Sequence, residues 1–196
     1  MKISIKIGIH SLYKTRFLFF YINIKIDFEK NLYVIAYYKM SFTQQNATDN
    51  YITDKNGWEL IKNFIPQDKQ IWAPFYCDGK QKEIFKDMGY DIIHEDEDFF
   101  TNNKGDIIID NPPYGLMKEI TERLFLLDKP FILILPTRYF GIKYFMDKFK
   151  NDIQIIIPSR RPTFTKLGEN STGYTPPGGT YYFCWKLGLE KDLNFI

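Results

Sequence analysis

The residues that could most clearly take part in chemistry are Asn111 and the two prolines after it. They come soon after a run of three isoleucines, 107–109. β-Branched residues between acidic ones predict a buried strand, and the prolines predict that it ends in a rigid turn. A proline has no backbone donor and disfavours helix in the residue before it. The carbonyls around Asn111 and Pro112 are therefore predicted to be free to accept hydrogen bonds from a ligand.

Two neighbouring acceptors suit a planar NH2 group. If the side-chain carbonyl of Asn111 and the main-chain carbonyl of Pro112 accept both amine protons, the nitrogen lone pair is aimed at an electrophile. Tyr114 offers a face on which the ring that carries the amine can stack. A neutral amine that attacks a sulfonium methyl loses its proton only as the bond forms, so no base is needed at the start. The alternative is an ordinary strand-to-loop exit, but the strand before the turn favours the functional interpretation.

The tetrapeptide Asn111-Pro112-Pro113-Tyr114 resembles the catalytic motif of class I S-adenosylmethionine-dependent amino-methyltransferases. That family includes N6-adenine methyltransferases of DNA and RNA, guanine-N2 methyltransferases of ribosomal RNA and glutamine methyltransferases of release factors. The resemblance covers about residues 50–187. It implies S-adenosyl-L-methionine as cofactor and catalytic roles for all four residues.

A second stretch is similar to the family's cofactor loop, which runs acidic-Pro-Phe-x-Gly-x-Gly after the first strand and approaches the methionine part of the cofactor. The chain keeps Pro74, Phe75 and Gly79. It departs at Ala73, where the family has an acid, and at Cys77, where it has a glycine. Asp78 is a candidate to supply the missing charge. Restoring the acid with Ala73→Asp is expected to tighten cofactor binding.

The resemblance implies cofactor contacts upstream of this loop as well. Tyr51 and Thr53 stand in a segment similar to the family's Tyr-x-Thr-Pro, which helps to hold the cofactor carboxylate, although Asp54 replaces the proline. A helix cap beside a core tryptophan is the alternative for this segment.

Acidic residues follow the predicted second strand, 90–96. There Glu95, with Asp96 next to it, is expected to accept hydrogen bonds from the ribose hydroxyls. Asp98 and Phe99 resemble an Asp-Phe element that meets the adenine of the cofactor; a capping Asp with core phenylalanines is the alternative. His94 is interpreted as a partly buried strand residue rather than a base.

The order of predicted elements gives the fold class. A first strand before the cofactor loop and strands at 90–96, 106–110, 131–135 and 153–157 alternate with helices at 58–65, 80–88, 116–127 and 144–150, and a last strand covers 181–186. This order predicts an α/β, Rossmann-like, mostly parallel sheet with helices on both faces. The resemblance implies that the last strand is antiparallel, as in a minimal class I methyltransferase fold. Residues 165–180 show no helical or strand period and are predicted to be a loop.

In such sheets ligands bind beyond the carboxyl ends of the strands. Arg138, Arg160 and Arg161 are placed there as phosphate contacts, and Phe164 as a stacking surface for a base. The alternative is a solvated loop. Duplex DNA would have to present a flipped-out adenine. The loop is too short to form a target-recognition domain, so sequence selectivity is expected to be weak or to be supplied by a partner protein.

Composition bounds the remaining choices. The 196 residues allow one domain of ordinary size. Residues 1–39 hold seven Lys or Arg and two acidic residues, a net charge of +5. Because the whole chain has a net charge of +2, residues 40–196 have a net charge of −3. Residues 1–39 are interpreted as an N-terminal appendage or an upstream extension before Met40, and 40–196 as the methyltransferase-like domain.

Cys77 and Cys184 suggest neither a disulfide framework nor a metal site, and no stretch resembles a membrane span, so an intracellular, cytoplasmic location is expected.

Three functions compete on this evidence. The first is methyl transfer to the N6 amine of adenine in nucleic acid, DNA ahead of RNA. The second is methyl transfer to a protein glutamine or to guanine N2. The third is an inactive methyltransferase-like protein that binds nucleic acid or a partner and has lost the cofactor through Ala73 and Cys77.

Overall fold

The structure is a computed structural model that describes residues 6–8, 21–24, 34–35, 51–167, 173 and 178–196. The chain divides into two compact units, 1–41 and 42–196. In the first unit, three short strands, β1 (Lys6–Gly8), β2 (Tyr21–Ile24) and β3 (Val34–Ile35), form an antiparallel sheet in the order β1-β2-β3.

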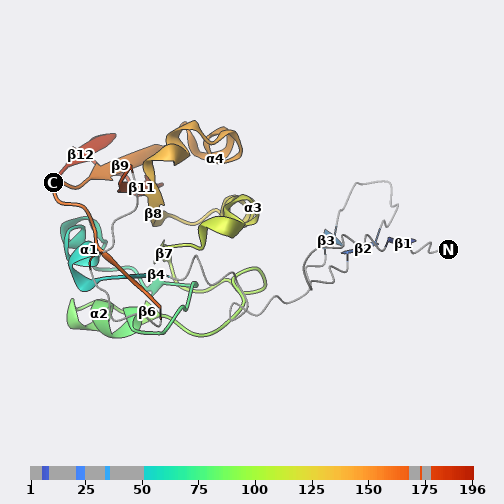
Figure 1. The fold of residues 1–196 in the computed structure, drawn as a ribbon, viewed down its shortest axis with the longest axis horizontal. Coiled ribbons are helices and arrows are strands. Elements are labelled where there is room, and N and C mark those ends of the chain that lie inside the picture. Colours follow the sequence, from blue (N-terminus) through green and yellow to red (C-terminus); the bar gives the residue numbers. More distant parts are fainter. Residues whose placement is uncertain (1–5, 9–20, 25–33, 36–50, 168–172, 174–177) are drawn as a thin grey trace. The chain divides into compact units, whose positions relative to one another are not determined.

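The second unit is built on a seven-stranded sheet of order β12-β9-β11-β8-β7-β5-β6 (Figure 1). Its strands are β5 (Ile71–Trp72), β6 (Ile92–Ile93), β7 (Ile107–Asp110), β8 (Phe131–Pro136), β9 (Ile153–Ile157), β11 (Thr180–Trp185) and β12 (Leu193–Phe195). Strand β11 runs antiparallel to both β8 and β9, and every other pairing in the sheet is parallel. The predicted fold class is confirmed, including the antiparallel strand.

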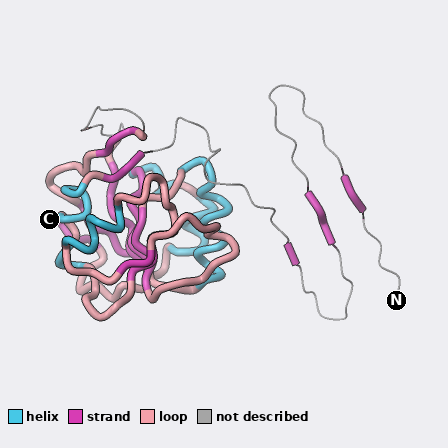
Figure 2. Tube along the Cα trace, turned by 90° about the horizontal axis from the view of Figure 1, so that it is seen from below, coloured by secondary structure: helices cyan, strands magenta, loops and turns pink. Residues whose placement is uncertain are grey.

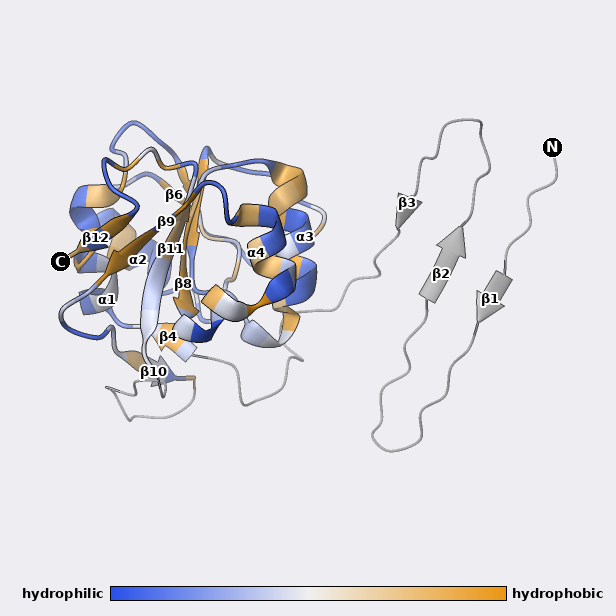
Figure 3. Cartoon of the chain, turned by 90° about the horizontal axis from the view of Figure 1, so that it is seen from above, coloured by the Kyte–Doolittle hydropathy of each residue, from blue (hydrophilic) through white to orange (hydrophobic). Residues whose placement is uncertain are grey.

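Helices cover both faces of this sheet (Figure 2). They are α1 (Lys55–Glu59), α2 (Gln81–Asp87), α3 (Met117–Leu127) and α4 (Lys143–Phe149), with 3-10 turns η2 (Lys62–Phe64), η3 (Tyr114–Leu116) and η4 (Thr137–Gly141). Strand β7 shows how the layers form, because all four of its residues are buried. Ile107 and Ile109 pack with α1 and α2, and Ile108 packs with α3 and α4. Consecutive apolar residues, here the three isoleucines before Asp110, suit a sheet covered on both faces, and Figure 3 shows apolar strands between helices of mixed polarity.

Two strands were not predicted. Residues 164–166 form β10 (Phe164–Lys166), which pairs antiparallel with β4 (Tyr51–Thr53) in a separate two-stranded sheet. The Asp54 carboxylate fastens this pair, because it accepts hydrogen bonds from the hydroxyls of Thr163 at 2.5 Å and Thr165 at 2.7 Å. Part of the predicted loop is therefore a strand.

The sheet also continues past Leu187, where the core was expected to end. Strand β12 pairs in parallel with β9. The side-chain amide of Gln154, in β9, also donates to the carbonyl of Leu189 at 2.8 Å, in the segment that leads to β12. No helix in the described part of the chain is both long and apolar enough to cross a bilayer.

Candidate active site

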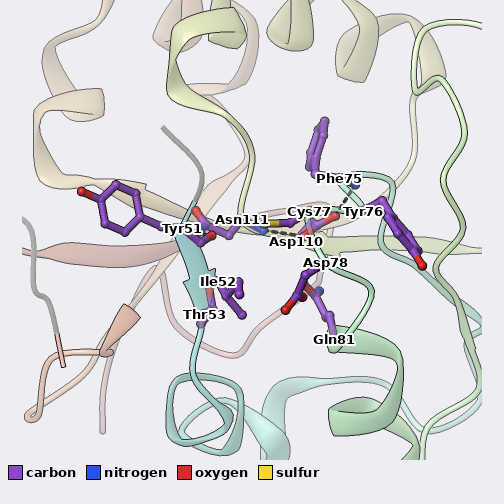
Figure 4. Close-up of a pocket in the computed structure, with 10 residues that line it drawn as sticks. All are labelled: Tyr51, Ile52, Thr53, Phe75, Tyr76, Cys77, Asp78, Gln81, Asp110 and Asn111. Atoms are coloured by element: carbon purple, nitrogen blue, oxygen red, sulfur yellow. Dashed lines mark hydrogen bonds between the residues drawn. The ribbon is translucent and has the colours of Figure 1, made fainter. Parts of the chain in front are cut away.

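A cleft lies at the carboxyl edge of the sheet, where the chain changes direction. From β5 the chain continues to β6 on one side, and β7 lies on the other side of β5. Open parallel sheets bind ligands at such a point. The residues after β5 and β7 face β4 across an empty volume of about 270 Å³ that includes space open to solvent (Figure 4). The lining residues are Tyr51, Ile52, Thr53, Phe75, Tyr76, Cys77, Asp78, Gln81, Asp110 and Asn111.

Asp110 joins the two walls of the cleft. Its carboxylate accepts hydrogen bonds from the backbone N–H of Phe75 at 2.7 Å and of Asn111 at 2.8 Å. The loop after β5 is thereby tied to the turn after β7. The side chain is 1% exposed, and burial raises the pKa of Asp110 to about 8 although both backbone donors and the Gln81 amide act to lower it.

The raised pKa has a defined effect on folding. The folded chain holds this proton more tightly than the unfolded chain. At pH values below the ordinary pKa of an Asp side chain, Asp110 therefore makes its full contribution to the stability of the fold. That contribution is lost as the pH rises through about 8.

The side chain of Asn111 is oriented from two sides. Its Oδ1 accepts a hydrogen bond from the Tyr114 hydroxyl at 3.0 Å, and its Nδ2 lies 3.5 Å from the Tyr51 carbonyl. A carbonyl oxygen has two lone pairs, so Oδ1 can accept one further donor. Tyr114 therefore holds Asn111 in position through its hydroxyl, a role that the sequence did not predict.

The carbonyl of Pro112 was expected to be left without a hydrogen bond by the turn. No donor among the described residues reaches it, whereas the next carbonyl, of Pro113, accepts from the Leu116 N–H at 3.1 Å. The strand exit therefore offers the Asn111 side chain and the Pro112 carbonyl as acceptors one residue apart.

The loop after β5 contains two residues with left-handed backbone. Gly79 has φ +80°, and Cys77, where the family has a glycine, has φ 48°. A side chain at positive φ costs about 1–2 kcal/mol, which glycine avoids. The loop thus keeps a backbone shape that glycine favours while carrying a cysteine. Removal of the thiol from water, with the charges of Asp78 and Asp110 as smaller causes, raises the pKa of Cys77 to about 11, although the residue as a whole is exposed.

Cys77→Gly is expected to raise the free energy of unfolding by about 0.5–1 kcal/mol. Removing the side chain from a residue with positive φ relieves about 1–2 kcal/mol of backbone strain. This gain exceeds the cost of about 0.4–1 kcal/mol that arises because glycine raises the conformational entropy of the unfolded chain. Cys77→Val, with a β-branched side chain at the same φ, is expected to lower it by about 1 kcal/mol. Urea unfolding of the three proteins measures both changes. A valine variant as stable as the glycine variant would contradict the left-handed assignment.

Ala73 cannot take the acidic role. It is 0% exposed and packs in the apolar cluster with Trp58 and Ile61, and it does not line the cleft. The expectation that Ala73→Asp tightens cofactor binding is therefore withdrawn, because the new carboxylate would be buried among apolar side chains. The acids at the cleft are Asp78 and Asp110.

Asp78 and Thr53 add polar groups to the cleft wall. Asp78 Oδ2 lies 3.0 Å from the Lys80 ammonium. The Thr53 hydroxyl is buried and has no hydrogen-bond partner among the described residues. Such an orphaned group is costly unless a ligand or water pairs with it. No group of three or more His, Cys, Asp or Glu in the described part of the chain is placed to hold a metal ion.

The residues assigned to the ribose lie outside the cleft lining. The Glu95 carboxylate pairs with Lys104 at 2.8 Å, which also pairs with Glu97 at 2.7 Å, and Lys104 holds the pKa of Glu95 below its ordinary value. Asp96 is exposed. Glu97, interpreted only as a solvated charge, is therefore part of a surface ion-pair group.

The Asp-Phe element serves the local structure. Asp98 Oδ1 accepts from the Phe100 N–H at 3.0 Å, so this residue caps a turn. Phe99 is 0% exposed, and its ring centroid lies 5.1 Å from that of Phe75. These contacts fit the alternative of a capping Asp with a core phenylalanine, and Phe99 packs against Phe75 in the loop after β5.

Tyr76 covers the end of β6. Its ring stacks on that of His94, with centroids 5.1 Å apart, and its hydroxyl lies against Gly79. His94 is 2% exposed, its Nδ1 lies 2.7 Å from the Ala73 carbonyl, and burial lowers its pKa. The histidine is thus a buried neutral group, and Tyr76 occupies the space between the loop and β6.

The substrate residues divide into two groups. Arg138, Arg160 and Arg161 are exposed and have no carboxylate partner in the part of the chain that the structure describes. Arg138 lies over the rings of Tyr114 at 5.8 Å and Tyr139 at 5.6 Å. Phe164, by contrast, is 1% exposed in the apolar core, so its ring is not available to stack on a base.

The structure places five of the eighteen predicted site residues in the lining of one cleft, namely Asn111, Tyr51, Thr53, Phe75 and Asp78. The other five lining residues, Asp110, Gln81, Tyr76, Cys77 and Ile52, were not predicted as site residues. Only Asp110 left a signal, since a carboxylate that ends a fully apolar strand must be buried with partners.

Comparison of the chain with protein-family models and with curated protein sequences found no match.

Proposed function

We propose that this chain transfers a methyl group from S-adenosyl-L-methionine to an exocyclic amine, the N6 amine of adenine in nucleic acid. The observation that carries the proposal is the strand exit at Asn111: an oriented amide oxygen lies in the lining of a cleft with two carboxylates, and the next carbonyl along the chain, of Pro112, accepts no hydrogen bond from the described residues. When bound, the cofactor supplies an electrophilic methyl on a cationic sulfur.

The cleft suits the charged half of that cofactor. A sulfonium and an ammonium are cations, and the lining contains Asp78 and Asp110 but no Lys or Arg. The unpartnered hydroxyl of Thr53 can pair with a carboxylate or an ammonium. Because the empty volume of about 270 Å³ includes space open to solvent, the enclosed part of the cleft is much smaller than a small-molecule site, and the nucleoside half of the cofactor requires the Tyr76 ring to leave His94.

Nucleic acid is the proposed substrate class because of the charges beyond the cleft. Arg138, Arg160 and Arg161, which have no carboxylate partner among the described residues, can contact phosphates, while the hydroxyl of Tyr114 bonds to the amide oxygen of Asn111. A base that reaches Asn111 must be unpaired or flipped out, and we place DNA ahead of RNA as its source.

Two measurements test the proposal. Calorimetry with S-adenosylmethionine and with S-adenosylhomocysteine is expected to show binding; absence of binding up to millimolar concentration would favour an inactive binding protein. Transfer of a tritiated methyl group is then measured on unmethylated DNA, RNA and protein pools. Label in N6-methyladenine is the expected product. Label in glutamine or in guanine N2 would keep the amino-methyltransferase chemistry and overturn the substrate.

A further inference from the structure

A buried carboxyl group lies where the cleft would receive a positive charge. Asp110 is 1% exposed, lines the cleft and is held by two backbone N–H groups, so its position is fixed. A carboxylate buried without a cation is costly, and an apolar residue there would continue the isoleucine strand. The cost is recovered only when a cation enters.

The other groups around Asp110 do not neutralise it. The ionisable lining residues are Tyr51, Tyr76, Cys77, Asp78 and Asp110, and the neutral amides are Gln81 and Asn111. The ammonium of Lys80, next to the cleft, is paired with Asp78 at 3.0 Å. Asp110 has no cationic partner among the described residues, and the buried Thr53 hydroxyl, which has no hydrogen-bond partner among them either, is a separate sign that a ligand completes this wall.

We infer that Asp110 is protonated in the unliganded protein at neutral pH and releases its proton when a cationic ligand fills the cleft. Asp110 thus acts as a positioning residue whose charge follows the charge of the ligand. This inference rests on the proposed function for the identity of that ligand.

The size of the effect follows from the titration of the unliganded group. With a pKa of about 8, roughly nine tenths of Asp110 side chains carry a proton at pH 7. Binding of S-adenosylmethionine is therefore expected to release about 0.9 proton per ligand at pH 7. For the same reason Kd is expected to fall by close to tenfold between pH 6 and pH 7, where the amino group of the ligand stays charged.

Calorimetry of the wild-type protein at pH 7 measures this directly. The binding enthalpy is determined in phosphate and in imidazole buffer, whose enthalpies of ionisation differ, and the slope between them gives the number of protons released. Binding with no buffer dependence would overturn the inference and leave the proposed function standing. Absence of binding in either buffer would overturn the proposed function itself.

Two variants assign the proton to its residue. Asp110→Asn is expected to abolish proton release and to flatten the dependence of Kd on pH between 6 and 7. Asp152→Asn, which removes an exposed carboxylate outside the cleft lining, is expected to keep both. Release that persists in the Asp110→Asn variant, or that disappears in the Asp152→Asn variant, would assign the proton elsewhere. The wild-type measurement decides the inference even if the Asp110→Asn variant is too unstable to assay.

Discussion

Asn111→Ala is expected to lower methyl transfer by about 10²–10³-fold while the Kd for S-adenosylmethionine changes by no more than a few-fold. The amide oxygen of Asn111 accepts from the Tyr114 hydroxyl and has one lone pair left for the substrate amine. Loss of one oriented hydrogen-bonding group at the reacting atom costs about this much in kcat. Single-turnover transfer and calorimetry on the same preparation measure the two quantities.

Asn111→Asp is the matched control. It keeps an oxygen that can accept from both Tyr114 and the substrate, so it is expected to retain more transfer than the alanine variant. Equal loss of transfer and of cofactor binding in Asn111→Ala would mean that Asn111 shapes the cleft and does not touch the substrate.

Ile109→Ala is expected to lower the free energy of unfolding by about 2–5 kcal/mol. Ile109 is 0% exposed in β7, opposite Ile132 of β8, and its side chain joins the cluster under α1 and α2. Truncation leaves a cavity beside the strand that leads into the turn at Asn111. Urea unfolding followed by circular dichroism gives the value.

Two further variants calibrate that result. Ile109→Val removes one methylene group and is expected to cost about 0.5–1.5 kcal/mol. Leu126→Ala, at a position 75% exposed on α3, is expected to stay within about 0.5 kcal/mol of the wild type. A loss in Leu126→Ala as large as that in Ile109→Ala would contradict the described core.

The elements that were predicted well are those whose own residues show a clear pattern. Three isoleucines followed by Asn-Pro-Pro define β7 and its turn, and apolar spacing predicts α3 within a residue or two. Strands β10 and β12 have three residues each, too few to show a period, and they exist because β4 and β9 offer them partners.

The candidate site was predictable where backbone chemistry defines it and not where tertiary contacts do. Pro112 and Pro113 cannot donate, so the open carbonyl could be inferred. The sequence could not show that Lys104 pairs with Glu95, because the two residues meet only after the loop between them folds. Nor could it show that Phe164 turns inward, since a pairing with β4 determines its direction.

The place of β11 in the sheet bears on how the domain is assembled. This strand, 180–185, is made after β8 and β9 but lies between them, in register with Pro136 at one end and Ile153 at the other. A nascent chain that has emerged only through β9 has no neighbour for the inner edges of β8 and β9, and the aromatic rings of Phe183 and Trp185 are still missing from its interior. Completion of the domain on the ribosome therefore waits for one late segment, and these six residues cannot be trimmed as chain ends often can.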